Sequence, residues 1–178
     1  MSNAIEMIKN RRSVRSFKDE MIPRGVLETI LEAGTWAATG MNRQSPIILA
    51  VTNRALRDRL SAINAQILHA AGRDGSHDPF YGAPVVLVVL ADKNVPTCIH
   101  DGSLVMGNLM LAAGELGVGS CWIHRARETF ETEEGKAILR ELGVEGEYVG
   151  VGNCVLGYPM GETPAAKPRK ENSVSWAE

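Results

Sequence analysis

The stretch Asn108-Leu-Met-Leu-Ala-Ala-Gly-Glu-Leu-Gly-Val-Gly-Ser-Cys-Trp-Ile123 is the part of the sequence that most constrains the fold. Residues 104–116 are apolar nearly all round, which is typical of a helix in a core or at a helix–helix interface. Glycine at position 117 is a helix stop, and residues 120–124 are then predicted to form a strand. The stretch therefore predicts a buried helix that leads almost directly into a strand.

Patterns on either side of this stretch predict further strands and helices. Short apolar runs predict strands over residues 47–51, 84–90 and 148–156. Residues 84–90 are continuous and β-branched, as in a strand buried on both faces. Apolar residues at helical spacing predict helices over residues 3–11, 23–37, 56–67 and 138–142, with Pro23 in the first turn of the second. Because these elements mix without strict alternation, we expect a three-layer α+β or α/β sandwich.

The bulk composition fits an ordinary cytoplasmic protein. The 178 residues favour one domain over residues 1–178, and residues 157–178 are predicted to form an extended C-terminal tail because they lack a periodic apolar pattern. The net charge of −2 gives no general reason to expect binding to nucleic acid or membrane. The first residues lack the apolar core of a signal peptide, and no apolar run is long enough to span a bilayer.

The cysteines favour neither a disulfide framework nor a metal site. The sequence has three, and their spacing matches neither a zinc site nor a redox pair. Cys98 and His100 lie two apart without further metal-like partners, so no metal is expected. We interpret the cysteines as free thiols in a reducing compartment.

The cluster Arg11-Arg12-Ser13-Val14-Arg15 is the first candidate binding segment. Guanidinium groups match phosphate oxygens in a bidentate manner, and a serine hydroxyl adds a neutral donor. The alternative is a solvated basic turn whose arginines pair with Asp19 and Glu20. Taken alone, the cluster favours the solvated turn.

Three further segments carry candidate binding residues. The turn Trp36-Ala-Ala-Thr-Gly-Met-Asn-Arg-Gln44 presents side-chain amides that suit the edge of a heterocycle, although Asn42 is also typical of a left-handed turn. Trp122 and Ile123 end the strand beside His124 and can support one face of a ring, or they belong to the core with a surface histidine. The two cations of Lys167-Pro-Arg169 can hold a phosphate; the alternative is that this run only makes the tail soluble.

Other motifs are excluded by their context. Gly150-Val-Gly152 is followed by more strand, whereas a dinucleotide fingerprint is followed by a helix. The sequence has neither a Gly-x-Ser-x-Gly elbow nor a P-loop. The chemistry must therefore come from the four segments above.

Together and in this order, these segments resemble the nitroreductase family of flavoproteins, and the resemblance covers essentially the whole chain. It implies an α+β fold of three layers (α/β/α) in an intertwined homodimer. It also implies FMN as the cofactor and NADH or NADPH as the co-substrate. Cofactor contacts are implied for Arg11, Arg12, Ser13, Arg15, Ala38, Thr39, Gly40, Asn42, Gln44, Trp122, Ile123, His124, Lys167 and Arg169.

The resemblance divides these contacts between two subunits. The arginine cluster, Lys167 and Arg169 are implied at the FMN phosphate, and residues 38–44 are implied to come from the partner subunit. The apolar helix over residues 104–116 is expected at the interface, with the tail wrapped around the partner. Arg12 or Arg15 is the candidate for stabilising the reduced ring near N1 and O2.

The implied activity is hydride transfer from NAD(P)H to the flavin and then to a nitroaromatic, a quinone or a similar small acceptor. Flavin N5 is then the reactive centre, and His124 either donates a proton or shapes the pocket, the second being favoured. The chain departs from the family pattern at Ala38-Thr39, Ser45-Pro46 and His124, and it leaves little room for a substrate lid between Leu68 and Pro84.

Other functions remain open at this point. They are a non-catalytic module that stores or senses FMN, and a flavin enzyme of the same fold that performs reductive dehalogenation or flavin breakdown. A last alternative is an oligomeric protein that binds some other anion without flavin.

Overall fold

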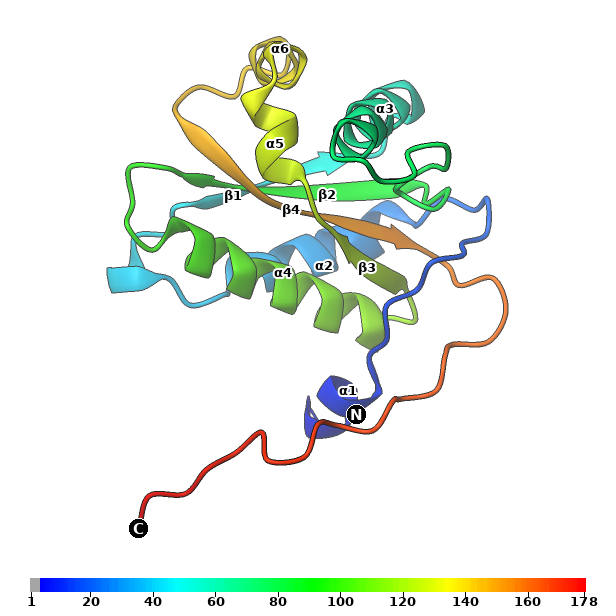
Figure 1. Cartoon of the computed structure of the whole chain (residues 1–178), viewed down its shortest axis with the longest axis vertical. Helices are drawn as coiled ribbons and strands as arrows, with labels where there is room; N and C mark the ends of the chain where they lie inside the picture. Colours follow the sequence, from blue (N-terminus) through cyan, green and yellow to red (C-terminus); the bar gives the residue numbers. More distant parts are fainter. Residues whose placement is uncertain (1–3) are drawn as a thin grey trace.

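A four-stranded sheet forms the centre of the protein. The structure is a computed structural model that describes residues 4–178, so Asn3 of the predicted first helix lies outside the described residues. The strand order is β1 (Pro46–Val51), β2 (Val85–Asp92), β4 (Tyr148–Gly157) and β3 (Gly119–Ile123). All neighbouring pairs are antiparallel, and helices lie on both faces of the sheet (Figure 1). The fold is therefore α+β, as the sequence predicts.

Strand β2 divides the core into two halves because successive side chains of a strand point to opposite faces. Its odd-numbered residues pack with one set of helices and its even-numbered residues with the other. The helices of the first face are α2 (Arg24–Thr35) and α4 (Cys98–Glu115), and those of the second are α3 (Arg54–Ala70), α5 (Ala126–Glu131) and α6 (Glu133–Glu141). Residues 85–91 are all fully buried, which confirms the prediction of a strand buried on both faces.

Helix α4 lies along the sheet with one face buried and the other partly exposed. The buried face includes Val105, Met106 and Leu109, which contact the sheet and α2. On the other face Leu104 is 52% exposed, and a Cβ atom added at Gly107 would meet no atom within 4 Å. The sequence of this helix is apolar on nearly all sides, but only one of its faces is buried within this chain.

The predicted elements are present, but several boundaries differ. Helix α4 begins at Cys98, six residues before the predicted apolar run, because its first turns carry polar residues such as His100 and the buried Asp101. Pro23 is the residue before α2 and not part of its first turn, and α2 ends at Thr35. Helix α5 was not predicted, because six residues are too short to show a clear helical period.

A β-bulge explains the glycines of Gly150-Val-Gly152. Leu90 lies opposite Gly150 and Val89 opposite Gly152, so Val151 is an extra residue in β4. A Cβ at Gly150 would lie 2.2 Å from the carbonyl oxygen of Ala126, at the start of α5. A Cβ at Gly152 would lie 2.7 Å from Nε1 of Trp122. These glycines allow close packing within the fold, in agreement with the exclusion of a dinucleotide motif.

The two ends of the described chain extend away from the sheet. Helix α1 (Ala4–Asn10) has no buried residue, and the chain after β4 makes an isolated bridge between Phe17 and Pro159 and forms no further strand or helix. Both ends project below α4 in Figure 1. None of the helices within residues 4–178 combines the length and the apolar character needed to cross a membrane.

The cysteines of the described chain are free, as expected. Cys121 and Cys154 are buried, and Cys98 is partly buried. Burial raises the pKa of the Cys154 thiol to about 12, so this thiol stays protonated at neutral pH. Its role is packing in the core.

Candidate functional site

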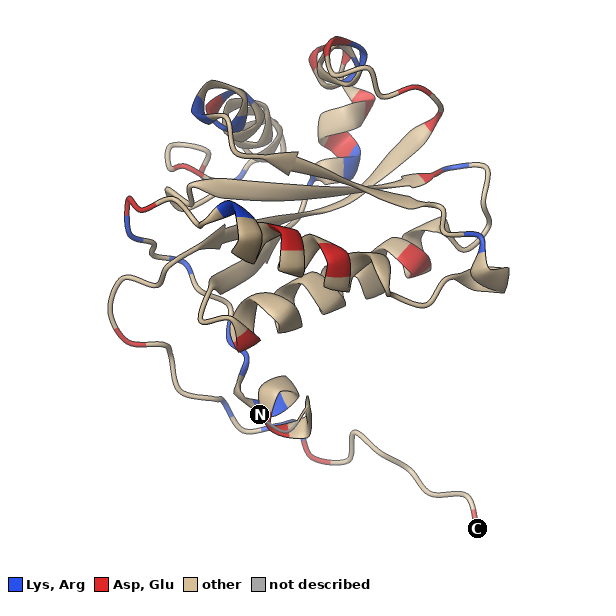
Figure 2. Cartoon of the chain, turned by 180° about the vertical axis from the view of Figure 1, so that it is seen from behind, with Lys and Arg blue, Asp and Glu red and all other residues tan. Residues whose placement is uncertain are grey.

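The arginine cluster lies in an extended segment beside the sheet. The backbone N–H of Val14 donates to the carbonyl of Ser120 in β3 (2.9 Å), and the N–H of Lys18 donates to the carbonyl of Tyr158 (2.9 Å). Val14 and Phe17 are buried and hold the segment against the core. Figure 2 shows the basic residues of the segment that joins α1 to the body of the protein. The chain is thus fixed at Val14 and again at Lys18, just beyond the cluster.

A first cavity of about 220 Å³ opens at the start of the cluster. Arg11, Arg12 and Ser120 line it, together with Pro159 and Thr163 from the beginning of the tail. Nη1 of Arg11 and Nε of Arg12 are buried and have no hydrogen-bond partner within the described chain. Since buried guanidinium groups are rarely left unpaired, these atoms indicate an anionic ligand.

The alternative of a solvated basic turn is not what the structure shows for these arginines. Asp19 pairs with Arg54 (3.5 Å), and neither Arg11 nor Arg12 forms an ion pair among residues 4–178. Nη1 of Arg12 donates instead to the carbonyls of Lys9 (2.6 Å) and Arg11 (2.8 Å). This turns Arg12 back toward the end of α1 and leaves Arg11 as the guanidinium most available to a phosphate.

A second cavity of about 360 Å³ opens at the other end of the cluster. It is lined by Arg15, by the end of β3 and by the segment that follows α3. Neither cavity has an Asp or Glu among its lining residues. The two cavities therefore lie on either side of residues 11–15, and arginines line both of them.

The strand end contributes to the second cavity in a way that the sequence did not predict. Strand β3 ends at Ile123, so His124 lies just after it and is exposed. Trp122 packs against the core beside α4, whereas Ile123 packs against the opposite half of the core. The pleat therefore directs the two side chains to opposite faces of the sheet, although both residues line the second cavity.

Asn64 of α3 is a further residue of the second cavity that sequence reasoning missed. It is 1% exposed, and its Nδ2 donates to the carbonyl of His124 (2.9 Å). Its Oδ1 is buried without a partner in the described chain, so it can accept a hydrogen bond from a ligand. The available signal was a polar side chain next to Ile63 on the apolar stripe of a predicted helix.

The turn over residues 38–44 lies far from the arginine cluster within one chain. The turn lies beside the start of α4, where Gly40 contacts Asp101, whereas Arg11 lies beside Gly114 near the end of this helix (Figure 1). The turn has left-handed backbone at Met41, Asn42 and Gln44, which confirms the turn conformation expected for Asn42. Such strained backbone is usually maintained by its surroundings and is often found at binding sites.

Asp101 of α4 holds this turn in place. It is 3% exposed and accepts hydrogen bonds from the backbone N–H of Gly40 (3.0 Å) and from Oγ1 of Thr97 (2.8 Å). Within the turn, Nε2 of Gln44 donates to Oδ1 of Asn42 (3.2 Å). Thr39 and Gln44 line a third cavity of about 440 Å³, while Ala38, Gly40 and Asn42 do not.

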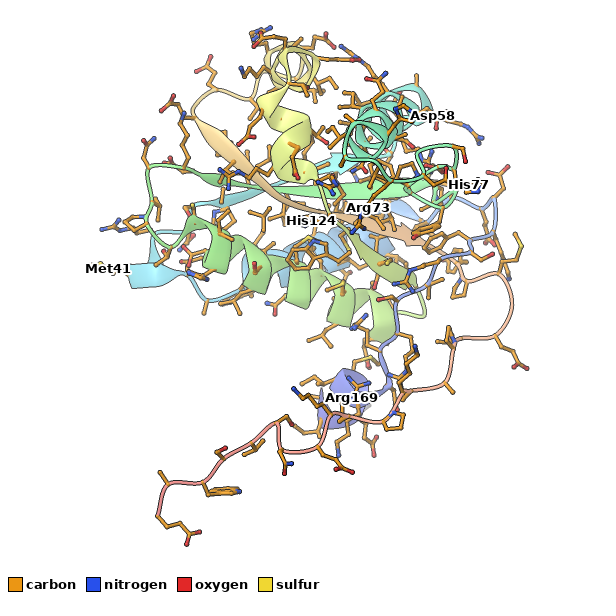
Figure 3. The ribbon with its side chains drawn as sticks, in the orientation of Figure 1. Met41, Asp58, Arg73, His77, His124 and Arg169 are labelled. Carbon is orange, nitrogen blue, oxygen red and sulfur yellow. The ribbon has the colours of Figure 1, made fainter. Side chains whose placement is uncertain are left out.

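The tail cations are not brought to the first cavity. Lys167 and Arg169 are exposed, and Nη2 of Arg169 donates to the carbonyl of Lys167 (3.0 Å). Figure 3 draws Arg169 at the level of α1, below the sheet. Ser13 forms an isolated bridge to Ser120, between the two cavities. The predicted site residues thus form one continuous group from Arg11 to Arg15 with the end of β3, and two groups that lie apart from it.

The segment between α3 and β2 is anchored by an ion pair. Arg57 has a side chain only 10% exposed and pairs with Asp78, which also accepts hydrogen bonds from the Ser61 hydroxyl and from the backbone N–H groups of Phe80 (2.9 Å) and Gly82 (2.7 Å). Burial alone would raise the pKa of Asp78, but these hydrogen bonds outweigh it and hold the pKa below its ordinary value. The ionised carboxylate therefore stabilises this segment.

Asp78→Asn is expected to destabilise the protein by about 2 kcal/mol at pH 7, because Arg57 loses its charged partner in a nearly buried position. The stabilisation from Asp78 is fully present above the unfolded-state pKa of 3.8 and is lost as the pH falls through the lower folded-state pKa. Urea unfolding should therefore give a difference in the free energy of unfolding between wild type and Asp78→Asn, and this difference should become smaller as the pH falls below 3.8. Asp19→Asn, at a carboxylate 92% exposed, is the matched control. A difference in the free energy of unfolding that stays constant with pH would contradict the role assigned to Asp78.

The fold and the two cavities define an α+β protein with arginine-lined cavities beside its sheet. The sequence matches the Nitroreductase family over residues 8–158. The chain therefore belongs to the nitroreductase family, as its resemblance implied.

Individual relatives agree with this assignment. A protein of Archaeoglobus fulgidus whose name pairs NADH dehydrogenase with NAD(P)H nitroreductase is 30% identical over 168 residues, which cover 91% of this chain and 88% of the relative. The oxygen-insensitive NADPH nitroreductase of Salmonella typhimurium is 25% identical over 95% of this chain and 70% of its own. The crystal structure of a nitroreductase with bound FMN from Bacteroides fragilis matches with a TM-score of 0.91 and 29% identity over the full length of both chains.

Proposed function

We propose that this protein is a single-domain, homodimeric oxidoreductase that uses FMN to pass hydride from NADH or NADPH to a nitroaromatic, a quinone or a similar small acceptor. As a member of the nitroreductase family, the chain is an oxidoreductase with FMN as its cofactor. The choice of acceptor and the dimeric assembly, with three layers in each intertwined subunit, are parts of the proposal.

The observation that carries the proposal is the pair of unpaired guanidinium atoms in the first cavity. Nη1 of Arg11 and Nε of Arg12 are buried donors without partners in the described chain, and no carboxylate lines the cavity around them. The phosphate of FMN supplies the acceptor oxygens that such donors require. The residues present therefore fit the cofactor, and Ser13, which lies between the two cavities, would contact the ribityl chain.

The second cavity is the proposed place of the flavin ring. Bound FMN supplies the chemistry of accepting a hydride from a reduced nicotinamide and passing it on. Arg15, which lines this cavity, would stabilise negative charge at the N1 and O2 edge of the ring, since Arg12 is already held by the end of α1. Asn64 would hydrogen-bond the polar edge of the ring through its unpaired Oδ1.

His124 is proposed to shape the cavity. Its backbone carbonyl accepts hydrogen bonds from Asn64 (2.9 Å) and, at longer range, from Asn153 (3.4 Å). These contacts fix the chain at the point where the strand ends, while the side chain stays exposed. A fixed backbone at this point would position the ring and exclude water from it.

The partner subunit is proposed to complete each site. Residues 38–44 lie beside the start of α4, whereas the arginine cluster passes the other end of this helix (Figure 1), so a second copy would supply them, and Lys167 with Arg169 would close over the phosphate. Large apolar side chains are exposed where such an interface would form. They are Ile5, Ile8, Trp36, Ile99, Leu104, Val174 and Trp176. Exposed apolar groups in this number favour association.

Gel filtration of the purified protein after incubation with FMN tests the proposal. The protein should elute at about twice the chain mass of 19.3 kDa and retain a flavin absorbance band near ~450 nm, and NADH or NADPH should bleach this band without oxygen. A monomer without bound flavin would contradict the proposal, and the arginine cluster would then be interpreted as a binding site for some other anion. Flavin that binds but is not bleached by either nucleotide would favour the storage or sensor alternative.

A further inference from the structure

The segment between α3 and β2 forms one wall of the second cavity. Arg73, Pro79 and Tyr81 from this segment line the cavity together with Trp122 and His124. Figure 3 shows Arg73 and His124 close together on the same side of the sheet. The short segment, which leaves little room for a lid, therefore shapes the cavity directly. The inference below rests on the proposed function and concerns the acceptor that this wall selects.

Arg73 is the cation of this wall that has no assigned partner. Nη1 of Arg125 pairs with Glu128 (2.8 Å), and Arg15 faces the proposed ring site. The neighbouring Asp74 accepts from the backbone N–H of Ser76 (2.8 Å) and lies 3.6 Å from His77. The guanidinium of Arg73 forms no ion pair within residues 4–178, and the cavity has no Asp or Glu among its lining residues. It therefore presents a free positive charge.

The backbone holds Arg73 at the mouth of the cavity. The N–H of Arg73 donates to the carbonyl of Leu68 (3.0 Å), and the N–H of Gly72 donates to the carbonyl of His69 (2.9 Å). These two bonds and the left-handed backbone of Gly72 (φ 70°) form a Schellman motif at the end of α3. The motif turns the chain back over the last turn of the helix, so Arg73 and Leu68 line the same cavity.

The opposite end of the wall is equally fixed. The hydrogen bonds from the backbone of Phe80 and Gly82 to Asp78 fix the turn that contains Tyr81. Tyr81 has left-handed backbone (φ 55°), and its side chain is partly exposed at the cavity. Pro79 has a restricted backbone of its own. The backbone on both sides of this wall is thus fixed before any ligand binds, which lowers the entropic cost of binding.

We propose that Arg73 and Tyr81 select acceptors that combine an aromatic ring with an anionic group, such as a carboxylate. The anionic group would form a charge-assisted pair with the guanidinium of Arg73, and the ring would pack between Tyr81 and the proposed flavin. Arg73 is then a specificity-determining residue, which orients the acceptor but takes no part in hydride transfer.

Paired acceptors that differ only in charge test this proposal. The ratio of kcat/KM for 4-nitrobenzoate to kcat/KM for 4-nitrobenzamide should fall by about tenfold in Arg73→Gln, because one charge-assisted contact is lost. Arg73→Lys should restore part of the ratio since it keeps the charge. Arg24→Gln, which removes another exposed charge on α2 away from the cavity, should leave the ratio unchanged. Equal losses for both acceptors, or none, would overturn the proposal.

Binding without turnover separates this proposal from the proposed function. Calorimetric titration of the FMN-loaded protein should give weaker binding of benzoate to Arg73→Gln by about tenfold and no change for benzamide. If the wild-type protein reduces neither nitro compound, the acceptor part of the proposed function fails, and the titration still decides the role of Arg73. Equal affinities of benzoate in wild type and Arg73→Gln would overturn that role.

The same variant distinguishes the acceptor from the nucleotide as the source of the anion. NADPH carries a 2′-phosphate that NADH lacks, and this phosphate is another possible partner for Arg73. With 4-nitrobenzamide as acceptor, the ratio of KM for NADPH to KM for NADH should be the same in wild type and Arg73→Gln. If that ratio rises in Arg73→Gln while the kcat/KM ratio of 4-nitrobenzoate to 4-nitrobenzamide stays unchanged, Arg73 binds the nucleotide and the proposal is overturned.

Discussion

Arg11→Met is expected to weaken FMN binding by about 100-fold while changing the affinity for riboflavin by less than about threefold. The phosphate is the only group that distinguishes the two ligands, and Nη1 of Arg11 is a buried donor that has no partner in the described chain. Two charge-assisted hydrogen bonds from one guanidinium account for an effect of this size. Fluorescence titration of the protein with each flavin measures both affinities.

The choice of methionine keeps the apolar stem of the side chain, which lies near Gly114 of α4. The empty protein should be as stable as the wild type or more stable, because an unpaired buried polar group is replaced by an apolar one. Arg24→Met, at a side chain 82% exposed on α2, is the matched control and should bind both ligands as the wild type does. Equal losses for FMN and riboflavin would mean that Arg11 acts on the ring site or on folding, and not on the phosphate.

The elements of the fold were predictable wherever a local pattern decides them. The continuous apolar run at residues 85–90, rich in β-branched valine, is typical of a strand buried on both faces, and the structure buries it fully. Helix α5 was missed because six residues show no clear helical period, and its close contact with Gly150, more than twenty residues further along the chain, is visible only in the folded structure. The antiparallel order of the strands likewise follows from contacts between distant segments, which no window of sequence displays.

The site was predictable where its residues are contiguous. The segment from Arg11 to Arg15 stands out because its charges are dense, and the structure places it beside the end of β3. Asn64 and Arg73 were missed because each belongs to the cavity only after α3 packs against the sheet. Asp101 was missed because its role is to accept hydrogen bonds from a turn some sixty residues earlier. Local sequence thus identifies the basic cluster, whereas packing decides which residues surround it.

Gly150→Ala is expected to destabilise the protein by about 3 kcal/mol, at the upper end of the usual cost of overpacking, because the added methyl group meets backbone on the facing element. The carbonyl oxygen of Ala126 would lie 2.2 Å from the new Cβ and its carbon 2.3 Å, so neither can be relieved by rotation of a side chain. Thermal unfolding should show a fall in Tm of roughly 10 °C for a protein of this size. The β-bulge beside Gly150 fixes this close approach of α5 to β4.

Gly25→Ala is the matched control, since it makes the same chemical change in α2, where the added Cβ meets no atom within 4 Å. This variant should be stabilised by up to about 1 kcal/mol, because alanine favours the helix and reduces the freedom of the unfolded chain. Opposite signs for the two variants would establish that the clash, and not the loss of glycine, decides the result. An unchanged Tm in Gly150→Ala would instead mean that α5 moves away from β4 at little cost. Since α5 begins two residues after His124, the second cavity would then be adjustable at this point and would not have a fixed wall.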